Sequence, residues 1–124
     1  MPLLIGLMSG TSLDGIDAAL VTCGEPGPDG TQEAPRLLAT HEVAMPTSLR
    51  ATLLELCHAH AVRFADLARA EDAFCRLQAR AVSELLAASK TPASAVAAIG
   101  SHGQTIEHAP LGHPDKDASA PYTL

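Results

Sequence analysis

A short polar loop between two apolar segments constrains the fold of this chain more than any other feature. Residues 3–8 form a continuous apolar run, and residues 16–21 place Ile16, Ala18 and Leu20 at alternate positions. A short apolar run that ends in turn residues predicts a buried strand, and the alternation predicts a second strand. The sequence therefore predicts a β-hairpin over residues 3–23.

The rest of the chain has the periodicities of an α/β domain. A turn-rich segment at residues 24–30 precedes a third predicted strand at residues 37–45, which ends before Pro46. Two helices are expected over about residues 47–90, and Thr47 or Ser48 is a candidate N-cap of the first. The second helix is predicted by an apolar stripe at helical spacing. The stripe consists of Leu67, Ala70, Phe74, Leu77, Ala81 and Leu85.

A fourth predicted strand begins at residue 95 and leads into a polar loop, so that strand and loop together span residues 95–106. The order β-β-β-α-α-β fits a mixed sheet with helices packed on it. Residues 122–124 have the character of another strand. A natural domain seldom ends where a strand begins, because the backbone groups of that strand would lack partners. We therefore expect the natural chain to continue past Leu124.

The composition excludes several classes of function. Fourteen acidic residues against eight basic ones give a net charge of −6, and only three side chains are aromatic Phe or Tyr. This is not the basic, base-stacking surface of a nucleic-acid-binding protein. The apolar run at residues 3–8 is too short to span a bilayer, and no basic residue precedes Arg36 as a signal peptide requires. The sequence predicts a cytoplasmic protein without a membrane partner.

The loop after the first strand has the composition of a phosphate-binding loop. Its glycines permit close approach of the backbone to phosphate oxygens, and Thr11 and Ser12 add hydroxyl donors. Asp14 or Asp17 could hold the water shell of a magnesium ion. The loop is not a Walker A motif, because isoleucine stands where that motif has lysine. An ordinary hairpin loop, whose glycines and hydroxyls only shape the turn, fits the spacing as well.

The polar segment Ser101, His102, Gly103, Gln104 and Thr105 directly follows the fourth predicted strand. In open α/β sheets, ligands bind outside the carboxyl ends of the strands. Imidazole, amide and hydroxyl groups at that place suit a hydroxyl-rich sugar. A polar turn with a solvated histidine remains the alternative for this segment taken alone.

Together, the two polar segments resemble motifs of the anhydro-N-acetylmuramic acid kinase family. GLMSGTSLDGID at residues 6–17 is similar to the opening motif of that family, and IGSHGQTI at residues 99–106 is similar to a second one. PYTL at residues 121–124 is similar to the start of a third. The resemblance runs along the whole chain, closely in the motifs and loosely through the helices.

The resemblance implies the two-lobed, ribonuclease H-like fold of sugar kinases, actin and Hsp70-type ATPases. Residues 1–124 would then be a partial N-terminal lobe, truncated, with the second lobe absent. The implied reaction uses ATP, with Mg²⁺ on the phosphates. Water opens the 1,6-anhydro ring of the muramic sugar while O6 receives the γ-phosphoryl group. The product is N-acetylmuramic acid 6-phosphate, in the pathway that recycles peptidoglycan.

The resemblance also assigns ligands to the two segments. The residues expected near ATP are Gly10, Thr11, Ser12, Leu13, Asp14, Gly15, Ile16 and Asp17. The residues expected near the sugar are Ser101, His102, Gly103, Gln104 and Thr105. In the family, the general-base aspartate lies in a motif beyond the third one, and much of the ATP pocket comes from the second lobe. No catalytic base is therefore expected within residues 1–124, and we expect this segment alone to be inactive.

The implied partners are ATP and a small amino sugar, and the resemblance leaves a homodimer open for the full-length enzyme. Two other readings remain. The first is a related kinase of the same superfamily that acts on another sugar or acid, which a substrate panel would distinguish. The second is a non-catalytic module that binds a phosphate or a sugar, which gains weight if the reading frame ends at Leu124.

Overall fold

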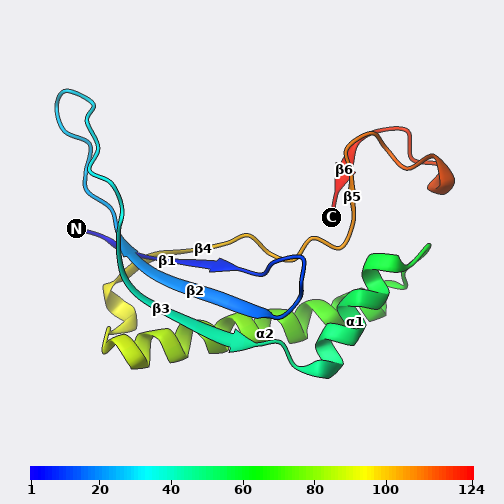
Figure 1. Cartoon of the computed structure of the whole chain (residues 1–124), viewed down its shortest axis with the longest axis horizontal. Helices are drawn as coiled ribbons and strands as arrows, with labels where there is room; N and C mark the ends of the chain where they lie inside the picture. Colours follow the sequence, from blue (N-terminus) through cyan, green and yellow to red (C-terminus); the bar gives the residue numbers. More distant parts are fainter.

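A four-stranded sheet forms the centre of the computed structural model, which describes residues 1–124 (Figure 1). Its strands, in the spatial order β3-β2-β1-β4, are β1 (Leu3–Met8), β2 (Gly15–Thr22), β3 (Arg36–Ala44) and β4 (Val96–Ser101). The pairs β1–β2 and β2–β3 are antiparallel, whereas β4 runs parallel to β1. The predicted hairpin and the predicted mixed sheet are both confirmed.

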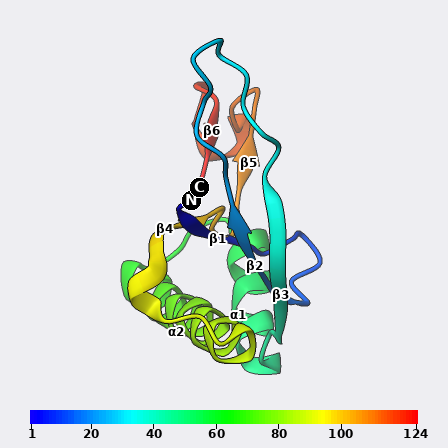
Figure 2. The same ribbon diagram turned by 90° about the vertical axis from the view of Figure 1, so that its left-hand side faces the viewer.

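Two helices lie on one side of the sheet (Figure 2). They are α1 (Thr47–His58) and α2 (Phe64–Ser89), and α2 packs along β2 and β3. The apolar stripe predicted for the second helix is confirmed, since all its members except the half-buried Leu67 are buried. The predicted N-cap is wrong. Pro46 occupies the cap position without a side-chain cap bond, because α1 starts at Thr47, directly after β3 and Met45.

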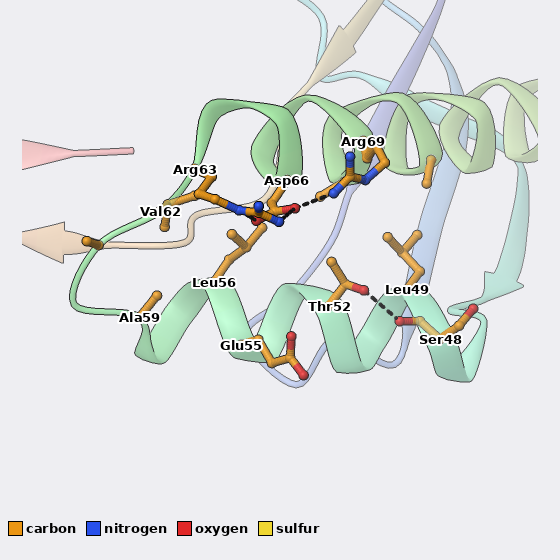
Figure 3. Close-up of a pocket in the computed structure, with 13 residues that line it drawn as sticks. Ser48, Leu49, Thr52, Glu55, Leu56, Ala59, Val62, Arg63, Asp66 and Arg69 are labelled. Atoms are coloured by element: carbon orange, nitrogen blue, oxygen red, sulfur yellow. Dashed lines mark hydrogen bonds and ion pairs between the residues drawn. The ribbon is translucent and has the colours of Figure 1, made fainter.

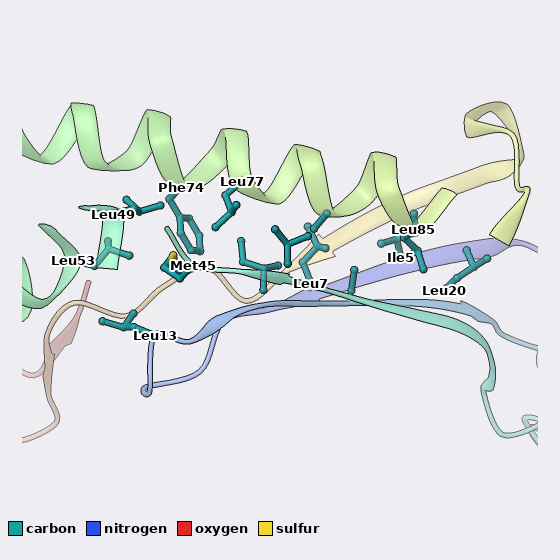
Figure 4. Close-up of a cluster of buried hydrophobic side chains, with 14 residues drawn as sticks. Ile5, Leu7, Leu13, Leu20, Met45, Leu49, Leu53, Phe74, Leu77 and Leu85 are labelled. Carbon is teal, nitrogen blue, oxygen red and sulfur yellow. The ribbon is translucent and has the colours of Figure 1, made fainter. Parts of the chain in front are cut away.

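One apolar core lies between the sheet and the helices, and it contains 14 buried residues (Figure 4). Alternate positions of β1 and β2, such as Ile5 and Ile16, point toward α2, as a strand period of two requires. Leu13 joins this core from the loop between β1 and β2, and it is only 1% exposed. The opposite face of the sheet carries the exposed residues Met8 and Asp17, and neither helix covers it.

The C-terminal segment forms a separate small sheet of β5 (His108–Ala109) and β6 (Tyr122–Thr123). The strand predicted at the end of the chain is therefore present, but it pairs with β5 and not with the main sheet. Two short 3₁₀ turns complete the fold, at Ala93–Ala95 and Pro114–Lys116. None of the helices is both long enough and apolar enough to span a membrane.

Candidate functional site

The two motif segments lie next to each other because β1 and β4 are parallel neighbours. β1 ends at Met8 and β4 ends at Ser101, so both following loops leave the same edge of the sheet (Figure 1). Parallel strands place their carboxyl ends together, which is where ligands bind in open α/β sheets. The predicted phosphate loop and the predicted sugar loop thus share one edge.

Two hydrogen bonds join these loops directly. The backbone N–H of His102 donates to the carbonyl oxygen of Leu7 over 3.1 Å. The hydroxyl of Ser9 donates to Oε1 of Gln104 over 2.5 Å, and Ser9 is only 4% exposed. A buried polar contact of this kind costs stability if either partner is removed, because the other is left unsatisfied. The two motifs therefore form one structural unit.

The buried side chain of Leu13 anchors the first loop to the apolar core. The backbone N–H of Leu13 donates to the carbonyl oxygen of Gly10 over 3.2 Å, which closes a tight turn. The backbone of Leu13 lies in the left-handed region with φ of 55°, which is uncommon for a leucine. Its buried side chain holds this conformation, and a second bond from Met45 N to Asp14 O (2.9 Å) ties the loop to the end of β3. Such a strained, over-determined backbone is typical of sites that hold a ligand.

The predicted nucleotide residues divide into surface and core groups. Those exposed at the loop surface or on the uncovered sheet face are Gly10, Thr11, Ser12, Asp14 and Asp17. The side chains of Leu13 and Ile16 are buried in the core, so only their backbone atoms are left to contact a ligand. Gly15 is needed for packing, since a Cβ there would lie 2.4 Å from the carbonyl oxygen of Val43.

The carboxylates of Asp14 and Asp17 are exposed, and neither takes part in an ion pair of the structure. No group of three or more His, Cys, Asp or Glu side chains is arranged to hold a metal ion. Magnesium usually keeps several waters and binds one or two carboxylates together with substrate phosphates. These residues therefore fit a magnesium ion held through water beside a nucleotide, and they do not form a metal cage made of protein alone.

The second loop is ordered by hydrogen bonds to Ser101 and Gln104. Oγ of Ser101 accepts a bond from Gly103 N (3.0 Å) and another from Nε2 of Gln78 on α2 (2.5 Å). Nε2 of Gln104 donates to the carbonyl oxygen of Thr105 over 3.1 Å. Both ends of the Gln104 amide thus bind protein, whereas Ser101 and His102 are exposed.

Sequence reasoning missed two residues of this network. Ser9 lies inside the first motif but was not assigned a role, because nothing in the sequence shows that this serine is buried. Gln78 lies on a helix, 23 positions before its partner Ser101, and no spacing rule connects the two.

Two hollows of the surface are large enough for a ligand. One, of about 710 Å³, lies between α1 and α2, and its walls include Asp66, which forms ion pairs with both Arg63 and Arg69 (Figure 3). It contains none of the predicted site residues. The other, of about 660 Å³, lies on the uncovered sheet face and brings Asp17 of the first motif together with His102 of the second. The second hollow is the better candidate because both motifs contribute to it.

A mixed sheet whose first hairpin and parallel fourth strand bring two polar loops together belongs to the sugar-kinase and actin-like ATPase class of folds. The family model described as anhydro-N-acetylmuramic acid kinase matches residues 2–118. The chain therefore belongs to the anhydro-N-acetylmuramic acid kinase family, as the motifs indicated.

Curated relatives agree with this assignment. The anhydro-N-acetylmuramic acid kinase of Chromohalobacter salexigens is 57% identical over 116 residues, which are 92% of this chain and 29% of that protein. The enzyme of the same name from Bordetella petrii is 47% identical over 112 residues, 90% of this chain and 28% of the relative. The one from Pseudomonas syringae pv. tomato is 46% identical over 106 residues, 86% of this chain and 27% of the relative. The chain thus spans less than a third of the length of these relatives.

Proposed function

We propose that the complete protein carrying this chain is an ATP-dependent, cytoplasmic kinase of peptidoglycan recycling. It opens the anhydro ring of 1,6-anhydro-N-acetylmuramic acid with water and phosphorylates O6, which gives N-acetylmuramic acid 6-phosphate. Family membership and the names of the relatives support this activity. The structural observation that supports it is the Ser9–Gln104 hydrogen bond, because it joins the loop after β1, which we assign to the nucleotide, to the loop after β4, which we assign to the sugar.

Each loop has a distinct role in this proposal. The backbone N–H groups near Gly10, with the hydroxyls of Thr11 and Ser12, donate hydrogen bonds to phosphate oxygens of ATP. Asp14 or Asp17 orients water molecules beside those phosphates, where a bound magnesium ion would neutralise their charge. Such positioning and charge stabilisation make up most of the catalysis of phosphoryl transfer.

The sugar loop orients the acceptor. Ser101 and His102 are exposed at the edge of the sheet and bind polar groups of the sugar, while Gln104 holds the loop in register with the phosphate loop. The attacking water needs a base within about 2.6–3.2 Å. By the family pattern that base is an aspartate outside this chain, so we do not assign the role to Asp14 or Asp17.

The experiment is a product assay with the complete protein and Mg-ATP. The acceptors are 1,6-anhydro-N-acetylmuramic acid, N-acetylglucosamine, glucose, glycerol and acetate, and mass spectrometry detects ADP and the phosphorylated product. We expect turnover with the anhydro-sugar alone. Preferred turnover of another acceptor would show a related kinase of the same superfamily. Binding of ATP or sugar without turnover would show a non-catalytic module.

A further inference from the structure

The hydroxyl of Ser101 has a polarity fixed by its neighbours. A serine oxygen has two acceptor lone pairs and one donor hydrogen. Gly103 N–H and the Nε2 of Gln78 both donate to Ser101 Oγ, at 3.0 Å and 2.5 Å. Both lone pairs are then used, and the hydroxyl hydrogen remains free to donate. Ser101 is exposed and its side chain lies on the α2 side of the sheet, so this hydrogen is available to a ligand that reaches the edge of β4 and not to one confined to the hollow on the uncovered face.

The two donors are held on rigid backbone. Gln78 lies on α2 next to Leu77, and Ala81 follows three residues later; both of these neighbours are buried in the core. Gly103 has φ of 73°, a left-handed conformation that only glycine adopts easily, and it directs its N–H back to Ser101. A donor pair placed on fixed elements keeps the orientation of the hydroxyl constant.

We propose that Ser101 is a specificity-determining donor, and that Gln78 is a positioning residue that sets its polarity. The partner of Ser101 is an oxygen of the sugar that accepts this hydrogen, namely a carboxylate, ether, carbonyl or hydroxyl oxygen. A ligand hydroxyl that offers its own hydrogen finds no free lone pair at Ser101. This inference rests on the proposed function, which assigns the loop of residues 101–105 to the sugar.

The test reverses the polarity of the Gln78 contact. In Gln78→Glu the new carboxylate can only accept, so the Ser101 hydrogen turns toward it and away from the ligand. In Gln78→Ala the hydroxyl loses one donor but stays free to rotate toward the ligand. Titration calorimetry of the complete protein with 1,6-anhydro-N-acetylmuramic acid should show about tenfold weaker binding for Gln78→Glu and about threefold for Gln78→Ala. ATP affinity should be unchanged in both variants.

Two controls separate polarity from charge and from folding. Ala79→Glu places a carboxylate at the next exposed position of α2, and sugar affinity should stay at the wild-type value. Ser101→Ala should weaken sugar binding about as much as Gln78→Glu, and the double variant should be no weaker than Ser101→Ala alone. Thermal unfolding of each variant should match that of the wild type, since Gln78 is not part of the buried core.

The outcomes distinguish this inference from the proposed function. Equal sugar affinity of Gln78→Glu and Gln78→Ala, or additivity with Ser101→Ala, would overturn the fixed polarity while leaving the kinase assignment intact. A wild-type protein that binds no anhydro-sugar would overturn both. The neutral sugar 1,6-anhydro-N-acetylglucosamine identifies the acceptor. A Gln78→Glu effect that persists with this sugar indicates an ether, carbonyl or hydroxyl oxygen, and an effect that vanishes indicates the carboxylate.

Discussion

The hydroxyl of Ser9 donates a 2.5 Å hydrogen bond to Oε1 of Gln104, across 95 positions of sequence. Ser9 is buried at the end of β1, and the other end of the Gln104 amide donates to Thr105 O over 3.1 Å. Gln104 therefore links the loop after β1 to the loop after β4. We therefore expect a ligand that orders one loop to affect the other through this bond.

Removing the Gln104 side chain should affect binding of the sugar more than binding of the nucleotide. Gln104→Ala should raise KM for the anhydro-sugar more than KM for ATP, because Gln104 belongs to the loop assigned to the sugar. Ser9→Ala should lower the free energy of unfolding by about 1 kcal/mol, since Oε1 of Gln104 loses its donor. Steady-state kinetics and urea unfolding of the complete protein measure both effects, with the exposed Ser94→Ala as control. A larger rise in KM for ATP would show that the segment serves the nucleotide.

Two glycines of the first loop should respond differently to substitution. A Cβ at Gly10 would meet only Oγ of Ser12, at 3.8 Å, whereas a Cβ at Gly15 would lie 2.4 Å from Val43 O. Gly10→Val should therefore fold normally but weaken ATP binding about tenfold or more, because it obstructs the approach of phosphate to the backbone. Gly15→Ala should lose about 1–3 kcal/mol of stability through overpacking.

Calorimetric ATP titrations and thermal unfolding separate these two effects. A well-folded Gly10→Val protein with unchanged nucleotide affinity would refute the phosphate-loop assignment. A Gly15→Ala variant that is as stable as the wild type would show that β2 and β3 can move apart at this contact without a measurable cost.

Acid should loosen the C-terminal segment. The Lys116 ammonium, bonded to the Glu107 carboxylate over 2.5 Å, lowers the pKa of Glu107 from its ordinary value of 4.5, and a bond from Tyr122 adds to this. A lowered carboxyl pKa means that the stabilisation is complete above pH 4.5 and is lost as pH falls through the folded-state pKa. Lys116 also donates to Ala59 O over 3.0 Å, so its contact with Glu107 links β5 to the end of α1.

Tyr122 reports this change, because the 124-residue chain has one tyrosine and no tryptophan. Tyrosine fluorescence of the chain should show a transition below pH 4.5 that Glu107→Gln removes. The exposed Glu71→Gln variant, which lies on α2 away from this contact, should keep the transition. An identical acid transition in Glu107→Gln would assign it to another group.

Sequence patterns predicted the parts of the fold that depend on local periodicity. The alternation around Ile16 and the helical stripe around Phe74 each follow from the geometry of one element, and the structure confirms both. The N-cap failed because the chain passes from β3 into α1 at Pro46 with no room for a separate cap residue. The partner of β6 and the contact of Gln78 with Ser101 depend on how distant elements pack, which no local pattern encodes. Leu13, assigned to the nucleotide by motif, is a core anchor whose apolar character in a polar loop was the available signal.

Residues 1–124 alone should not turn over substrate. The chain covers only 29% of its relative from Chromohalobacter salexigens. From the family pattern we expect the catalytic base and much of the ATP pocket to lie outside this chain. A coupled assay for ADP release, with detection of the sugar 6-phosphate, should give no sugar-dependent signal for this chain beside an active complete protein. Sugar-dependent turnover by the short chain would direct attention to Asp14 and Asp17 as bases.

The central claim is that the loop after β1 and the loop after β4 form one ligand site. Its most direct test is hydrogen–deuterium exchange of the complete protein with each ligand in turn. A non-hydrolysable ATP analogue with magnesium should protect the backbone amides of residues 10–17, and 1,6-anhydro-N-acetylmuramic acid should protect those of residues 101–105. Because the Ser9–Gln104 bond joins the loops, each ligand should also slow exchange in the other loop, and Gln104→Ala should abolish this cross-protection. If neither ligand slows exchange in its assigned loop, or if the cross-protection persists in Gln104→Ala, the account is contradicted.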